Sequence, residues 1–85
     1  MAYFLKYRPA ALRQLKKLDT KNQGRLKPKI NELSENPRPH GYIKLKGFEN
    51  RYRIRVGDYR VIYEIHEDVL QVLIMRAGPR RDIYD

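Results

Sequence analysis

Residues 52–63 have the sequence YRIRVGDYRVIY, in which apolar residues alternate with other side chains on both sides of a Gly-Asp pair. Two alternating runs separated by Gly57 and Asp58 predict a β-hairpin with a two-residue turn. One face of this hairpin is aromatic and β-branched, which suits a core, and the other face is basic. On the basic face Arg55 lies directly opposite Arg60. Like charges in this position destabilise a sheet, so we expect an anion to lie across the two arginines.

The chain before the hairpin predicts one strand and two helices. Residues 2–7 are aromatic and alternating, as in a short strand, and Pro9 is well placed as the first residue of a helix. Leucines then recur at three-residue spacing as far as Leu18, which indicates an amphipathic helix. Asp19 is the expected N-cap of a second helix, which continues through Pro28 because its apolar stripe keeps phase there.

The chain after the hairpin predicts one more strand, residues 69–77, following a turn at 66–68. The resulting order, β-α-α-β-β-β, is typical of an α+β fold. We expect an N-terminal helical hairpin packed on one face of a mostly antiparallel four-stranded sheet, with a short C-terminal tail or helix. Residues 1–85 are expected to form a single domain.

The composition indicates a globular domain with an anionic partner. Nineteen Lys and Arg against ten Asp and Glu give a net charge of +9 and a pI of about 10.0. This balance predicts a polyanion, a membrane surface or an acidic protein as partner. The chain contains no cysteine, which excludes a disulfide and a thiolate metal site. The apolar run at the N-terminus is too short for a signal peptide or a membrane span, so we expect a cytoplasmic protein.

Apolar residues accompany the basic face of the hairpin. Continuing the pairing through a two-residue turn to the next strand places Met75 beside Arg60 and Leu73 beside Ile62. A solvent-exposed face of a single sheet is rarely both cationic and apolar. An anion site beside an apolar groove therefore explains the pattern better than a solvated charged face, which is the alternative.

The C-terminal tail adds further candidates. Arg80, Arg81 and Tyr84 follow the last strand, whose end is expected near the Gly57 turn, so Arg60 and Arg80 should be neighbours in space. Tyr84 could supply a ring for stacking on a base, or a phenol that gives and takes a proton. The alternative is a frayed basic terminus with a packing tyrosine.

The remaining titratable residues are expected to be structural. His66 lies six residues from Arg60 along one strand, about 20 Å away, and His40 belongs to a proline-rich loop. Neither is expected to reach a phosphate on the arginines, and the two show no metal-ligand spacing. Glu64 should pair with Arg51 across the hairpin. The sequence contains no nucleotide-binding glycine loop, nucleophile elbow or metal motif, so we expect neither a metal nor a cofactor.

Taken together, these segments resemble the RelE branch of the RelE/ParE superfamily, the toxins of type II toxin–antitoxin systems. The resemblance covers essentially the whole chain. It rests on four segments in order, namely AYFL at 2–5, KLKG at 44–47, the hairpin at 52–63 and GPRRDIY at 78–84. Some relatives have lysines where Arg53 and Arg55 stand, and many have a histidine at the place of Pro79.

The resemblance implies an mRNA interferase that enters the ribosomal A site and cuts mRNA there without a metal. In this family the 2′-hydroxyl attacks the adjacent phosphate. The implied catalytic residues are Arg53, Arg55, Arg60, Arg80 and Tyr84. The basic residues expected to contact RNA, mRNA or ribosomal RNA, are Lys44, Lys46, Arg51 and Arg81.

The resemblance also implies a small antitoxin that wraps the toxin in a hetero-oligomer. The apolar strip of Ile62, Leu73 and Met75 is its expected docking place. Two other functions stay open. A ParE-like poison of DNA gyrase shares the fold but generally lacks the tail arginine and tyrosine, so Arg80 and Tyr84 favour RelE. A non-catalytic module that binds nucleic acid or an antitoxin would keep the charge without needing Tyr84.

Overall fold

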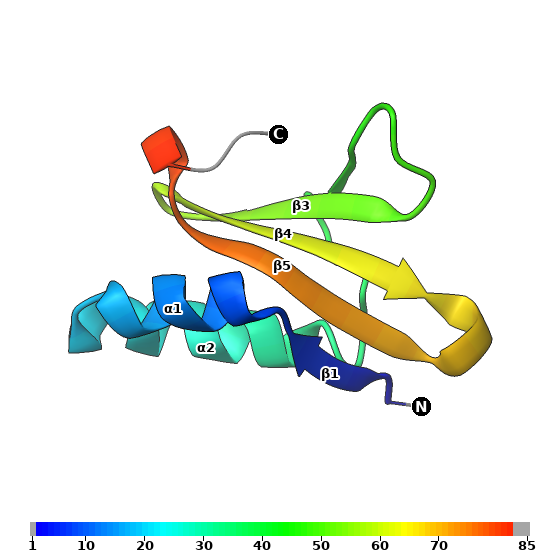
Figure 1. The fold of residues 1–85 in the computed structure, drawn as a ribbon, viewed down its shortest axis with the longest axis horizontal. Helices are drawn as coiled ribbons and strands as arrows, with labels where there is room; N and C mark the ends of the chain where they lie inside the picture. The colour runs from blue at the N-terminus through cyan, green and yellow to red at the C-terminus, as the bar shows by residue number, and fades with distance from the viewer. Residues whose placement is uncertain (1, 83–85) are drawn as a thin grey trace.

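Two helices cover one face of a five-stranded sheet in the computed structural model, which describes residues 2–82 (Figure 1). The elements are β1 (Phe4–Tyr7), α1 (Pro9–Lys17), α2 (Thr20–Glu32), β2 (Ile43–Lys44), β3 (Arg51–Val56), β4 (Tyr59–His66), η1 (Glu67–Val69), β5 (Gln71–Pro79) and η2 (Arg80–Asp82). The strand order is β1-β5-β4-β3-β2, with β1 parallel to β5 and the other neighbours antiparallel. The α+β class and the helical layer are as predicted.

The helix boundaries follow from local chemistry. Pro9 opens α1, where the missing N–H of proline costs no hydrogen bond. Asp19 is the N-cap of α2, and its side chain accepts a hydrogen bond from the backbone N–H of Asn22 at 2.9 Å. As predicted, α2 is one helix that continues through Pro28.

The register predicted for the central hairpin is confirmed. Val56 pairs with Tyr59, and the pairing extends in step until Arg51 lies opposite Glu64. Gly57 in the turn has φ +61°, a left-handed conformation that glycine adopts without strain. The Arg55–Arg60 apposition that the sequence predicts is therefore present.

The predicted number of strands was wrong, because the sheet has a fifth strand, β2, on its far edge. This strand has only two residues, Ile43 and Lys44, which pair with Arg53 and Tyr52. Two residues are too few to show an alternating pattern. The strand forms because β3 offers it an open edge, which is a tertiary cause.

The register predicted between β4 and β5 was also wrong. Arg60 faces Gly78 instead of Met75, and Ile62 faces Arg76 instead of Leu73. The connection after His66 contains η1 and a left-handed residue, Leu70 with φ 51°, so it is longer than a two-residue turn. A β-bulge between Ile62 and Tyr63 shifts the pairing by one further residue.

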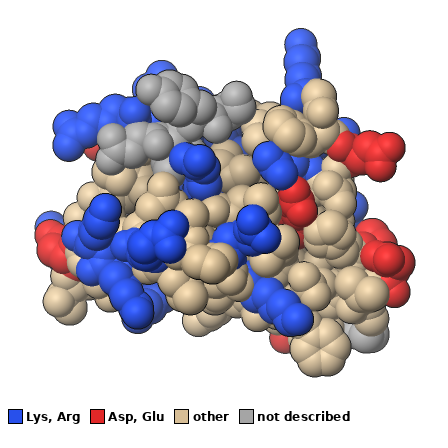
Figure 2. Space-filling view, viewed as in Figure 1, with Lys and Arg blue, Asp and Glu red and all other residues tan. Residues whose placement is uncertain are grey.

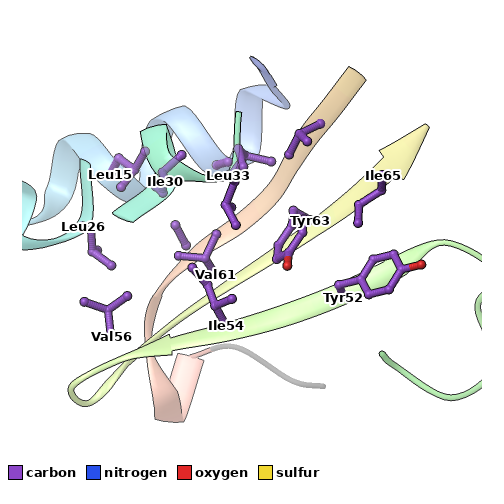
Figure 3. Close-up of a cluster of buried hydrophobic side chains, with 14 residues drawn as sticks. Leu15, Leu26, Ile30, Leu33, Tyr52, Ile54, Val56, Val61, Tyr63 and Ile65 are labelled. Atoms are coloured by element: carbon purple, nitrogen blue, oxygen red, sulfur yellow. The ribbon is translucent and has the colours of Figure 1, made fainter. Parts of the chain in front are cut away.

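The core lies between the helices and the sheet. Figure 3 shows leucine and isoleucine side chains of α1 and α2 facing valine, isoleucine and tyrosine side chains of β3 and β4. Tyr63 is fully buried there, and its hydroxyl donates a hydrogen bond to the carbonyl of Pro37 at 2.7 Å. Burial raises the pKa of Tyr63, so this hydroxyl stays protonated and keeps the loop before β2 against the core. Among residues 2–82, neither helix is long and apolar enough to cross a membrane.

Candidate functional site

The arginines of the hairpin project from the sheet face opposite the helices. Their strand neighbours Ile54 and Val61 belong to the core, and side chains alternate between faces along a strand. Arg53 and Arg60 are only 5% and 9% exposed, whereas Arg55 is exposed. Arginine is seldom this deeply buried, so two buried arginines distinguish this part of the sheet from an ordinary solvent-exposed face.

The end of β5 brings the tail to the hairpin turn. Tyr59 pairs with Pro79, and the backbone N–H of Arg80 donates to the carbonyl of Asp58 at 2.9 Å. The prediction that Arg60 and Arg80 are neighbours is thus confirmed for the backbone, since Gly78 lies opposite Arg60.

A hollow of about 270 Å³ lies beside this junction and is lined by Asp58, Pro79, Arg80 and Arg81. Both tail arginines are exposed at its rim. Tyr84, the remaining candidate of the tail, lies outside the described residues.

A further arginine, which the sequence pattern did not indicate, lies at the turn. The guanidinium of Arg25, on α2, lies so close to Gly57 that a Cβ atom on that glycine would collide with it. Glycine at position 57 therefore serves both the left-handed turn and the approach of Arg25. The sequence signal for this contact is weak, because an arginine in an amphipathic helix usually indicates a solvated face.

A groove of about 310 Å³ extends the basic region toward β2. It is lined by Ile43, Lys44, Leu45, Lys46 and Arg53. The ammonium group of Lys44 donates to the carbonyl of Phe48 at 2.8 Å, and Lys46 is exposed. The predicted RNA-contacting lysines therefore line the same groove as one of the predicted catalytic arginines.

At the far end of the hairpin, Arg51 is bound within the protein, as predicted. Its Nη2 and Nε atoms donate to one carboxylate oxygen of Glu64, at 2.6 and 3.1 Å, and its guanidinium lies 4.1 Å from the centre of the Phe48 ring. Burial alone would raise the pKa of Glu64, but the hydrogen bonds from Arg51 and from His66, at 2.9 Å, outweigh it and lower that pKa. An RNA contact by Arg51 stays a prediction.

The two histidines have different positions. His66 lies at the end of β4 away from the Gly57 turn, as expected, and the structure adds its contact with Glu64. His40 is closer to the arginines than its loop position indicates. It lines a hollow of about 120 Å³ together with Lys29, Glu32 and Arg55, because the loop before β2 crosses the open edge of β3.

The apolar part of this face forms a small cluster of its own. Leu45, from the segment after β2, covers Ile62, which is 3% exposed, and Met75 packs against both at partial exposure. Leu73 lies opposite Glu64 and is half-buried. Of the predicted antitoxin contacts, Met75 and Leu73 are thus accessible and Ile62 forms the floor. Among the described residues, no group of three or more His, Cys, Asp or Glu could hold a metal ion.

Positive charge is not confined to this face. Figure 2 shows Lys and Arg side chains spread over the surface that carries α1 and the strands beside it. A general positive field attracts polyanions at long range but marks no single site. Arg53 and Arg60 differ from these surface charges in their burial, and Arg55 and Arg60 differ from them in their apposition across two strands.

Comparison with known proteins identifies the class. The family described as the ParE toxin of the type II toxin–antitoxin system parDE matches residues 5–84. The mRNA interferase toxin RelE of Escherichia coli K12 is 33% identical over 82 residues, which cover 94% of this chain and 85% of that protein. The chain therefore belongs to the RelE/ParE family of type II toxin–antitoxin toxins.

Solved structures agree with this assignment. The intact RelBE toxin–antitoxin complex of E. coli matches with a TM-score of 0.81 at 31% identity, covering 92% of this chain and 96% of the matched chain. The archaeal RelE–RelB complex of Pyrococcus horikoshii OT3 matches with a TM-score of 0.82 at 30% identity, covering 94% and 97%. These relatives share the fold over nearly the whole chain.

Proposed function

We propose that the protein is a ribosome-dependent endoribonuclease, the toxin of a toxin–antitoxin pair, which cleaves mRNA in the ribosomal A site. The observation that carries this proposal is the meeting of Arg55, Arg60 and the Arg80 backbone at one hairpin turn. Relatives at about one-third identity are named mRNA interferases, which supports an RNA substrate.

In the proposed reaction the 2′-hydroxyl of one nucleotide attacks the adjacent phosphate and loses its proton, while the bond from phosphorus to the 5′-oxygen of the next nucleotide breaks. The products are a cyclic phosphate and a 5′-hydroxyl, whose oxygen takes up a proton as it leaves. Arg60 and Arg80 stabilise the negative charge that develops on that phosphate, because preorganised cations act most strongly where charge appears in the transition state. The fork of an arginine side chain suits phosphate oxygens and can also stack on bases. Arg53 and Arg55 bind the same RNA chain, and Tyr84 stacks on the nucleotide or orients it.

The groove beside β2 is proposed to hold the neighbouring part of the RNA. Lys44 and Lys46 contribute positive charge along it, and Arg53 connects it to the hairpin site. Arg81 extends the basic rim on the other side, next to Arg80. Arginine does not deprotonate in proteins, so the arginines of the site position RNA and stabilise charge without accepting a proton.

The partner in the proposed pair is an antitoxin that covers the same face of the sheet. The matched complexes of E. coli and P. horikoshii contain an antitoxin bound to the related toxin, which supports a hetero-oligomer here. Met75 and Leu73 offer partly exposed apolar side chains beside the arginines, so a chain bound there would also block RNA.

The proposal is tested by adding the protein to a translating extract and mapping the mRNA ends. We expect cuts within codons only while ribosomes occupy them. Arg60→Ala or Arg80→Ala should abolish the cuts, since each removes a cation from the reacting phosphate. Arg13→Ala, on the exposed face of α1, removes the same charge elsewhere and should cut like the unchanged protein.

The result also separates the other candidate functions. The matched family is named for ParE toxins, so a ParE-like gyrase poison is the second candidate. Uncut mRNA together with trapped gyrase–DNA complexes would replace the proposed function with that one. Uncut mRNA without such complexes would leave a non-catalytic binding module.

A further inference from the structure

Strand β5 has a strand neighbour on both sides for only part of its length. β4 pairs with it from Gln71 to Pro79, but β1 pairs only from Gln71 to Ile74. The backbone N–H of Arg8 donates to the carbonyl of Ile74 at 2.8 Å, and the chain then turns into α1. The last residues of β5 therefore have an edge that β1 does not cover.

A side chain of α1 takes the place of the missing strand. Ala77 is fully buried, and its backbone N–H donates to Oε1 of Gln14 at 2.9 Å. A buried amide needs a hydrogen-bond partner, and here that partner is a helix side chain. A hollow of about 290 Å³ adjoins this bond and is lined by Gln14, Lys17, Leu18, Ala77, Gly78 and Pro79.

The segment held by Gln14 leads directly to the tail arginine. Gly78 and Pro79 follow Ala77, pair with Arg60 and Tyr59, and are succeeded by Arg80, whose N–H binds the carbonyl of Asp58. The hairpin therefore holds one side of this segment and Gln14 holds the other. Loss of the Gln14 bond frees the outer side alone.

We propose that Gln14 is a positioning residue, which sets the place of Arg80 relative to Arg60 through the backbone of Ala77. The inference rests on the proposed ribonuclease function. It assigns a role in cleavage to a helix residue on the other side of the sheet from the RNA. Displacement of a catalytic group by about 1 Å can lower a rate by about 100-fold, so a single bond at this strand end is sufficient.

The test measures single-turnover mRNA cleavage on programmed ribosomes at varied toxin concentration. Gln14→Met keeps the length of the side chain but has no acceptor oxygen. We expect its maximal rate to fall by about tenfold while the half-saturating concentration changes less than about twofold, because RNA binding does not use Gln14. Gln14→Glu should recover most of the rate, since a carboxylate oxygen accepts the same bond.

A matched control separates positioning from general stability. Gln23, also partly buried, donates from Nε2 to the carbonyl of Leu18 at 2.8 Å, a bond within the helical layer beside the same hollow. Gln23→Met removes a comparable bond and should leave the maximal rate unchanged. In an Arg80→Lys background, which keeps the tail charge, adding Gln14→Met should slow cleavage by less than about twofold, because the two residues act through one group.

The possible outcomes distinguish a failure of the Gln14 inference from a failure of the proposed function. Equal rates for Gln14→Met and Gln23→Met, no recovery by Gln14→Glu, or a full additional loss in the Arg80→Lys background would overturn the Gln14 inference alone. Failure of the unchanged protein to cut would overturn the proposed function, and the inference with it. Faster amide hydrogen exchange at Ala77 in Gln14→Met, but not in Gln23→Met, is expected, and unchanged exchange there would also overturn the inference.

Discussion

At the scale of single residues, Gly57 has two physical roles that one substitution tests together. Its φ of +61° is a conformation that residues with a Cβ atom adopt at a cost, and the guanidinium of Arg25 occupies the space where that Cβ atom would lie. Alanine at this position therefore strains the turn and displaces Arg25. Both effects act on the end of the hairpin where Arg55, Arg60 and Arg80 meet.

We expect Gly57→Ala to destabilise the protein by about 1–2 kcal/mol, the usual cost of a left-handed residue with a side chain. Thermal unfolding should show a Tm lower by about 4–8 °C for each kcal/mol. Gly24→Ala is the matched control. No atom lies within 4 Å of a Cβ atom there, and Gly24 lies inside α2, so alanine should stabilise by about 1 kcal/mol. An unchanged Tm for Gly57→Ala would contradict the turn geometry.

At the scale of elements, the two ends of the β3–β4 hairpin differ in their electrostatics. Near the turn, like charges face each other across the strands, whereas at the other end Arg51 and Glu64 form an ion pair. The ion pair stabilises the end of the hairpin away from the turn, whereas the end near the turn concentrates positive charge. This arrangement is consistent with a structural base and a functional tip.

The ion pair predicts a dependence of stability on pH. The pKa of Glu64 is lower in the folded protein than its ordinary value of 4.5, so the unfolded chain binds the proton more readily. The stability from this group is complete above pH 4.5 and is lost as the pH falls through the lowered folded value. Glu64→Gln should lower the free energy of unfolding by about 1 kcal/mol at pH 7, measured by urea denaturation.

At pH 3 the difference between Glu64→Gln and the unchanged protein should be smaller than at pH 7, because protonation has begun to remove the charge in both states. Glu49→Gln, which changes an exposed carboxylate in the loop before β3, should show no such trend. A Glu64→Gln deficit that stays constant from pH 7 to pH 3 would show that charge is not the cause.

The elements also differ in how far the sequence predicts them. The β3–β4 register was correct because a two-residue Gly-Asp turn and strict alternation leave one pairing that buries the apolar face. The predicted β4–β5 register was wrong because η1 and the bulge after Ile62 add residues that no turn motif in the sequence indicates. The edge strand β2 was missed for a similar reason, since two residues contain no period.

At the scale of the whole molecule, the net charge of +9 predicts strong salt dependence of RNA engagement. For single-stranded nucleic acid, the logarithm of the binding constant falls linearly with the logarithm of the salt concentration. Each phosphate contact that is removed makes this slope shallower by about 0.7. We expect Lys44→Ala combined with Lys46→Ala to reduce the slope of subsaturating cleavage rate against KCl by about 1.4. The measurement is ribosomal cleavage between 50 and 200 mM salt, a range in which counterion release is large.

The matched control for this slope is Lys21→Ala combined with Lys27→Ala. Both residues are exposed on α2 in the helical layer, and the pair removes the same total charge. Its slope should equal that of the unchanged protein. Equal reductions for both pairs would mean that net charge, not the groove beside β2, controls the interaction.

By itself the sequence determined the α+β class, the two helices, the central hairpin and the Arg55–Arg60 apposition. Each of these depends on residues within one helix or across one short turn, where periodicity and turn chemistry act directly. Only the tertiary structure decided which strand edges are open, and with them the positions of β2, Arg25, His40 and the Gln14–Ala77 bond. These features join segments that are far apart in the chain. In the sequence a polar residue such as Gln14 indicates a solvent-exposed helix position, and only the structure shows that the end of β5 which it bonds lacks a neighbouring strand.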